Sequence, residues 1–125
     1  MLVLLLLSVG IFDAKASDSD IEQVGKFLAT GNSTDLAAHF NESLSVAILN
    51  EEANYQKAQA QVVVQEFFAD YSPQSFTLIH SGESSEGSKF GTGTLSTLNG
   101  SFRVYYLIRS SDSGFLIHDL RFEED

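Results

Sequence analysis

The sequence predicts an α+β domain in which a cone-shaped, curved antiparallel sheet wraps around N-terminal helices and one long helix. Helical spacing fills much of the first half of the chain. After Pro73 only strand patterns follow, in four runs that polar turns join. The helical segment Lys57–Tyr71 carries a broad apolar stripe, which is what the apolar face of a curved sheet needs as a cover.

Residues 1–16 have the features of a signal peptide. Met1 to Phe12 is rich in leucine and uncharged, and Ala14-Lys15-Ala16 forms a small-x-small cleavage site before Ser17. The apolar run is too short for a bilayer core, which takes about 20 residues. We therefore expect export, with residues 17–125 left as a single domain that does not contact the membrane. The alternative is that residues 1–16 form a buried strand or helix of the fold.

The composition excludes several classes of function. The formal net charge is −10, so the surface repels nucleic-acid phosphates and anionic membranes, and we expect no nucleic-acid partner. There is no cysteine, which excludes thiolate catalysis, disulfides and zinc sites built on sulfur. Ten Phe and four Tyr supply much of the apolar area that a core without disulfides requires.

Two short helices open the predicted domain. Ser19 and Glu22 have the spacing of a capping box, so we expect the first helix to begin at Ser19 and to end at Gly31. A second short helix can begin at Ser33. Its apolar face would consist of Leu36, Ala37 and Phe40.

A strand and a long helix follow. Leu44–Leu49 alternates apolar and small or polar side chains, as a half-buried strand does. The turn at residues 50–52 leads into a brief return strand at residues 53–56. The long helix then runs from Lys57 to Tyr71 and stops at Ser72-Pro73. Its apolar stripe is Ala60, Val63, Val64, Phe67, Phe68 and Tyr71.

The last half of the chain predicts four consecutive antiparallel strands, at residues 74–81, 89–98, 101–109 and 114–122. Asn99-Gly100 is the strongest hairpin signal of the chain. Gly91 and Gly93 lie inside a long strand, where they predict a sharp bend or a bulge.

Six short segments of the chain carry a resemblance to a known family. They are Asp20-Ile21-Glu22, Val64 to Phe68, Ser75-Phe76-Thr77-Leu78-Ile79-His80, Gly93-Thr94-Leu95, Gly100-Ser101-Phe102-Arg103-Val104-Tyr105 and Leu120-Arg121-Phe122-Glu123. With these segments the chain resembles a family of small exported proteins of unknown function in gram-negative bacteria. That family lies within the nuclear-transport-factor-2-like superfamily, which has a cystatin-like fold and also holds ketosteroid isomerases. The resemblance implies a periplasmic or extracellular location, and it implies no catalytic residues, because the shared segments are core and turn positions.

Five residues are candidates for lining a pocket. His80 shares a predicted strand face with Phe76 and Leu78, so it could sit at the mouth of the cone and titrate near neutral pH. Tyr106 lies on the apolar face of its strand, where its hydroxyl needs a partner from the protein or from a ligand. Tyr55 and Tyr71 flank the long helix and could border the same opening.

Asp119 is the fifth candidate, as the one acid well inside a strand pattern. A neighbouring Arg121 makes an ion pair the simpler interpretation. The opposite face of the strand at residues 101–109 carries Arg103 and Arg109 beside Tyr105 and Leu107. That half-apolar outer face is either a homodimer surface or a solvated one.

No cofactor or metal site is predicted. His39, His80 and His118 lie some 40 residues apart with no acid at a metal-binding spacing, and no Walker loop, dinucleotide fingerprint or nucleophile elbow occurs. His118 alternates with Leu116 and Leu120, which predicts a partly buried position.

Three functions stay open from the sequence. The leading prediction is a non-catalytic, exported binding or accessory domain for a small apolar ligand or a protein partner. The alternative is an isomerase, dehydratase or hydrolase that works from a pocket containing His80 or Asp119. A cystatin-like inhibitor is a third, although the Ser-rich loop at residues 82–88 lacks an apolar wedge.

Overall fold

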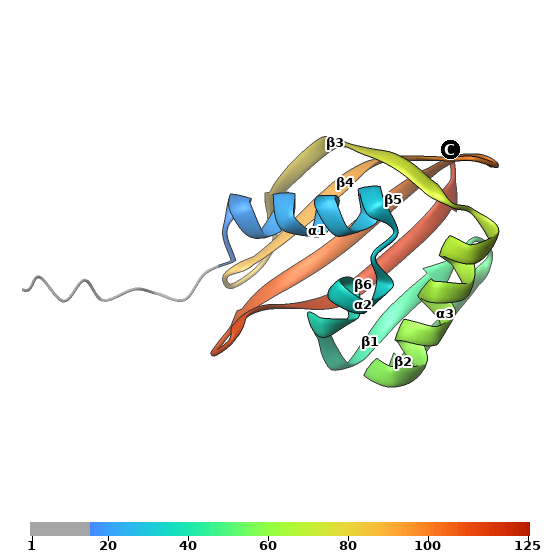
Figure 1. The fold of residues 1–125 in the computed structure, drawn as a ribbon. Helices are drawn as coiled ribbons and strands as arrows, with labels where there is room; N and C mark the ends of the chain where they lie inside the picture. The colour runs from blue at the N-terminus through green and yellow to red at the C-terminus, as the bar shows by residue number, and fades with distance from the viewer. Residues whose placement is uncertain (1–15) are drawn as a thin grey trace, which may run out of the picture.

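The computed structural model describes residues 16–125, which form a curved, open sheet of six strands with helices on its inner side (Figure 1). The α+β class that the sequence predicts is confirmed. In chain order, the elements are α1 (Asp18–Thr30), α2 (Ser33–Ala38), β1 (Phe40–Ile48), β2 (Glu51–Gln56), α3 (Lys57–Asp70), β3 (Pro73–Glu83), β4 (Ser88–Thr97), β5 (Gly100–Ser111) and β6 (Gly114–Glu124).

The strands lie in the order β2-β1-β6-β5-β4-β3. The four C-terminal strands pair antiparallel with their neighbours in sequence, as predicted. β1 pairs antiparallel with β2 but parallel with β6, so the sheet is not antiparallel throughout. The strands β1 and β6 are far apart in the sequence. The pattern of residues within each strand therefore does not reveal that the two strands run parallel. Consequently β2 and β3 are the two edges of the sheet.

The predicted signal peptide falls on residues of which only Ala16 is described. Ala16 is buried, and its backbone N–H donates to the carbonyl oxygen of Gly87 at 3.2 Å. Residues 1–15 lie outside the described part of the chain, so the signal peptide stays a prediction.

The first helix begins two residues earlier than predicted. Ser17, not Ser19, is the N-cap: its hydroxyl accepts from the Asp20 N–H at 3.2 Å, and its own N–H donates to the Asp20 carboxylate at 3.0 Å. The sequence contains two overlapping capping boxes, and the earlier one forms. The predicted stop is confirmed, because Gly31 adopts the left-handed conformation with φ of 63°.

The strands near the first turn are longer than the sequence indicates. Phe40 opens β1 instead of completing the face of α2, and it lies beside Ile117 of β6. β2 starts directly at Glu51, since the turn needs only Leu49 and Asn50. Pairing across the sheet thus extends β1 and β2 beyond what their own sequences favour.

The helix α3 lies on the inner side of the sheet (Figure 1). The buried residues of its stripe are Ala60, Val64, Phe67 and Phe68. The Phe67 ring lies 4.5 Å from the ring of Phe122 on β6 and 5.2 Å from that of Phe102 on β5. Val63 is only half-buried, and Val62 on the far side is 51% exposed. The predicted contact between an aromatic stripe and the last strands is therefore present.

Gly91 and Gly93 have no side chain, so aromatic rings can pack directly against the inner face of β4 at these positions. A Cβ at Gly91 would lie 2.6 Å from the Tyr106 ring, and one at Gly93 would clash with the backbone of Thr77 and the ring of Phe76. The bulge that these glycines predict lies in the facing strand, between Leu78 and His80 of β3.

Phe67→Ala should lower the free energy of unfolding by about 3–5 kcal/mol, because it removes the ring at the centre of the aromatic cluster. Urea denaturation measures the change. Val62→Ala on the exposed face of the same helix is the matched control and should change stability by no more than about 0.5 kcal/mol. Equal effects of both substitutions would mean that α3 does not cover the sheet.

Gly91→Ala should destabilise the protein by about 1–3 kcal/mol, because the new methyl group displaces the Tyr106 ring. In a Tyr106→Leu background the same substitution should cost less, since the far end of the ring is gone. Thermal unfolding of the four proteins gives the coupling. Additive effects of the two substitutions would contradict the close approach of Gly91 and Tyr106.

Candidate functional site

The five residues predicted to line one pocket lie in three different places. Tyr106 borders a cleft between α1 and β3, whereas Tyr55 and Tyr71 border a second cleft beside α3. His80 and Asp119 lie on the outer face of the sheet. The structure therefore does not assemble these residues into a single site.

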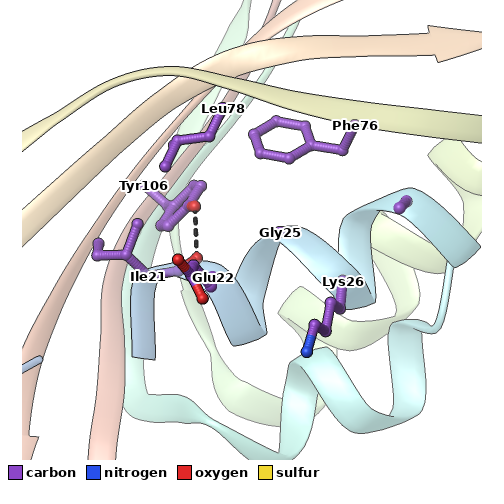
Figure 2. A pocket seen from close by; sticks show the side chains of 8 residues that line it. Ile21, Glu22, Gly25, Lys26, Phe76, Leu78 and Tyr106 are labelled. Carbon is purple, nitrogen blue, oxygen red and sulfur yellow. Dashed lines mark hydrogen bonds between the residues drawn. The ribbon is translucent and has the colours of Figure 1, made fainter. Parts of the chain in front are cut away.

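The first of these places, the α1–β3 cleft, has a volume of about 190 Å³. Figure 2 shows Phe76 and Leu78 of β3 facing Ile21 and Gly25 of α1, with Tyr106 of β5 behind them. Gly25 keeps the two elements close, because a Cβ there would be only 3.1 Å from the Phe76 ring. The full lining is Ile21, Glu22, Gly25, Lys26, Ala29, Phe76, Leu78 and Tyr106.

Tyr106 anchors α1 to the sheet. Its side chain is fully buried, and its hydroxyl donates to the carbonyl oxygen of Ile21 at 2.8 Å (Figure 2). Burial raises the pKa of Tyr106 well above its usual value. The hydroxyl therefore stays neutral with its proton engaged, which suits a structural anchor and not a proton donor in catalysis.

Besides the buried Tyr106, the ionisable side chains that line the α1–β3 cleft are Glu22 and Lys26, and both are exposed. Lys26 points away from Phe76 and Leu78 (Figure 2). A general acid or base would need a titratable group held in the apolar wall. The cleft offers an apolar surface of modest size with charge at its rim.

His80 does not share the inner face with Phe76 and Leu78, and this prediction was wrong. Leu78 pairs with Gly93, but His80 pairs with Thr92, so β3 holds one extra residue between them. Such a bulge reverses which side chains face inward. His80 is exposed on the outer face, where its ring lies 5.6 Å from that of Phe90.

Asp119 also faces outward, and the expected ion pair is present. The Arg121 Nε lies 3.1 Å from the Asp119 carboxylate, and Arg121 also reaches Glu52 of β2 at 2.8 Å. Burial raises the pKa of Asp119, while the hydrogen bond from Arg121 opposes that rise. The Asp119 carboxylate is paired with Arg121 and does not line the α1–β3 cleft.

The outer face of β4, β5 and β6 is half apolar, as predicted. The rings of Phe90 and Tyr105 stack there with centroids 6.1 Å apart. Beside them, a shallow groove of about 460 Å³ lies between Arg103, Asp119 and neighbouring residues. Arg103 pairs with Asp125 at 3.6 Å.

The other two histidines also take structural positions. His39 stacks on Phe115 with ring centroids 4.2 Å apart. His118 is partly buried, as predicted. It does not share a strand face with Leu120, because β6 has a bulge: Ile108 pairs with Ile117 but Leu107 with Asp119. Burial, and to a lesser degree Arg109, lowers the pKa of His118. Within residues 16–125, no His, Asp and Glu side chains gather as a metal site would require.

Tyr55 and Tyr71 border the second cleft, of about 240 Å³, between α3 and the β1–β2 hairpin. Sequence reasoning missed the carboxylates of Glu66 and Asp70 at this cleft. Their spacing of four residues was the available signal, because it places both on one face of the helix. The cleft therefore combines an apolar floor with acidic walls.

In residues 16–125, no helix is long and apolar enough to cross a membrane.

Comparison with solved structures supports both the fold and the family. A DUF4783 family protein from Bacteroides uniformis is 30% identical, with 83% of this chain and 95% of that chain covered and a TM-score of 0.77. Its counterpart from Bacteroides ovatus is 29% identical, with 82% and 92% covered and a TM-score of 0.76. An NTF2-like protein with a cystatin-like fold from Novosphingobium aromaticivorans is 11% identical and shares the fold alone, with 83% and 76% covered and a TM-score of 0.57.

No curated protein matches the chain. The family described as "Domain of unknown function (DUF4783)" matches residues 21–123, which is most of the sequence. The nuclear-transport-factor-2-like fold that the resemblance implied is thus confirmed, and this chain belongs to the DUF4783 family.

Proposed function

We propose that this protein is a non-catalytic, exported binding domain whose α1–β3 cleft receives an apolar side chain of a protein partner. The observation that carries the proposal is the cleft itself, which has walls of Ile21, Phe76 and Leu78, and in which the one buried ionisable group, Tyr106, already donates its proton to Ile21. Its volume of about 190 Å³ is below the roughly 300–1,000 Å³ of pockets that enclose drug-sized ligands. A single apolar side chain suits this volume better than a whole metabolite.

The neighbouring edge strand favours a protein over a small molecule. β3 ends the sheet, so among the described residues its outer edge has no strand partner. Ile79 is 67% exposed on it, and the strand has no Asp, Glu, Lys or Arg between Pro73 and Gly82. Exposed edges of this kind pair with extended segments of other chains. A partner strand along β3 would bring its side chains to the cleft.

The enzyme alternative depended on His80 or Asp119 in a deep pocket. Both side chains lie on the outer face, and Tyr106 uses its hydroxyl to hold α1. The binding proposal needs none of these groups to react. Export is supported by the leucine-rich residues 1–12 and the Ala14-Lys15-Ala16 site.

Ala29→Phe should fill the α1–β3 cleft and abolish partner binding, because the added ring takes the space of the incoming side chain. Affinity purification from the native host, followed by mass spectrometry, measures the bound partner. Ala58→Phe, the same change at an exposed position of α3, should retain it.

Thermal shift assays with small apolar probes form the second arm of this test, because a ligand at 100 times its Kd stabilises by about 2.7 kcal/mol. A shift that Ala29→Phe removes, without any protein partner, would assign the cleft to a small molecule. If no protein partner is captured and no probe shifts the melting temperature, the binding function is refuted.

We also propose that the outer face of the sheet joins two copies of the chain. The support is the half-buried aromatic pair of Phe90 and Tyr105, beside the charged groups of Arg103 and Arg121. A stable dimer would bury about 1,200 Å² or more in total. Each copy carries a net charge of −10, so added salt should strengthen the association by screening repulsion.

Tyr105→Arg should convert the dimer to a monomer, because it places a further cation on each copy at the centre of the contact. Sedimentation equilibrium measures the mass. Gln59→Arg adds the same charge at an exposed position of α3 and should leave the dimer intact. A wild-type protein that sediments as a monomer at high concentration and high salt would exclude this interface.

A further inference from the structure

The second cleft lies between the C-terminal half of α3 and the β1–β2 hairpin. We call it the acidic cleft. It is independent of the α1–β3 cleft, with which it shares no lining residue. It is lined by Ile48, Leu49, Glu51, Tyr55, Val63, Glu66, Phe67, Asp70 and Tyr71.

The floor of the acidic cleft is aromatic and fixed in place. The Tyr71 ring packs 5.0 Å from the Phe67 ring and 4.7 Å from the Phe102 ring. Tyr55 is half-buried against the same core. Within residues 16–125, neither tyrosine hydroxyl has a hydrogen-bond partner, so both can serve a ligand. This floor offers ring faces for stacking.

The walls of the acidic cleft carry uncompensated negative charge. Glu66 and Asp70 lie one turn apart on α3, on the stripe that also holds Val63, and Glu51 faces them from β2. None of these three carboxylates forms an ion pair with another described residue, and no Lys or Arg lines the cleft. All three side chains are exposed, so the cleft presents a negatively charged surface to a ligand.

The carboxylates of Glu66 and Asp70 lie at positions of α3 where a negative charge destabilises the helix. Asp70 is the last residue of α3, where the carbonyl end of the helix dipole disfavours an anion. Glu66 and Asp70 are four residues apart, a spacing at which like charges repel. The last turn of α3 contains no basic residue that would offset them. Stability alone therefore does not account for these acids.

We propose that the acidic cleft binds an arginine side chain on a basic segment of a partner protein. A guanidinium group is planar, so it stacks on tyrosine faces and donates in pairs to carboxylates. The apolar walls of Val63 and Ile48 would cover its aliphatic stem. The volume of about 240 Å³ accommodates one such side chain. The net charge of −10 would steer a basic partner towards the domain.

A metal ion is a poorer occupant than a guanidinium group. In the described part of the chain, these carboxylates do not meet the spacing of a metal site. Calcium and magnesium also prefer shells of oxygen atoms, whereas most of this surface is aromatic or aliphatic. The mixture of ring faces and carboxylates matches an organic cation.

The test uses the purified full chain and an acetylated glycine peptide with a single arginine. Titration followed by NMR of the ¹⁵N-labelled protein should shift signals of residues 48–55 and 63–71. Glu66→Gln and Asp70→Asn should each weaken binding by about tenfold, because each removes a charge-assisted hydrogen bond. Glu42→Gln and Asp112→Asn neutralise exposed acids outside the cleft and should change the Kd by less than twofold.

Three results would overturn the proposal. The first is equal binding of the same peptide with citrulline in place of arginine, because citrulline is neutral and similar in shape. The control variants could weaken binding as much as Glu66→Gln, which would indicate general attraction to an acidic protein. The arginine peptide could also fail to shift these signals at millimolar concentration.

A stability measurement separates a binding role from a structural one. Because the two acids disfavour the helix, Glu66→Gln and Asp70→Asn should leave the melting temperature unchanged or raise it. A lower melting temperature would show that the acids support the fold and would contradict the proposal. Ala29→Phe should not affect arginine binding, so a failure of the α1–β3 cleft function is distinguishable from a failure here.

Discussion

The fold depends on covering one face of a curved sheet. Strands β4, β5 and β6 turn Leu95, Val104, Tyr106 and Phe122 inward, and all four side chains are buried. The hydrophobic effect drives this burial, to which aromatic and aliphatic side chains both contribute. The helix α3 covers one end of the face with Phe67 and Phe68, while α1 covers the other end. Without both helices the inner face would stand in water.

The filled core decides where binding can occur. Aromatic rings from α3 and the sheet meet at the centre of the core. Tyr106 closes the other end by bonding to Ile21. The clefts beside these rings lie where a helix meets the sheet near its edges β2 and β3. The proposed binding sites therefore lie at the edges of the sheet, where another chain could reach them.

The sequence predicted the elements well and the candidate site poorly, for a physical reason. Gly31, Asn99-Gly100 and the stripe of α3 are local signals, and the helix end, the hairpin and the buried stripe that they predict are present. The hairpin turn lies one residue earlier than predicted, because it consists of Leu98 and Asn99 and Gly100 opens β5. The face on which a strand residue lies is not local once a bulge intervenes. An alternation counted from Phe76 fails at Ile79 and places His80 on the wrong side. The same error occurs at His118 of β6, where a second bulge interrupts the ladder.

The acidic residues near the C-terminus of α3 favour a role in binding over a purely structural one. A helix that only covered a sheet would gain from a basic residue near its C-terminus, yet α3 ends with Asp70, one turn after Glu66. These acids flank two tyrosines whose rings are held by the same core that holds the fold. The proposed arginine site thus combines fixed rings with carboxylates whose mutual repulsion a bound guanidinium group would reduce. Sites of this kind trade stability for binding, so the two properties should respond in opposite directions when a carboxylate is neutralised.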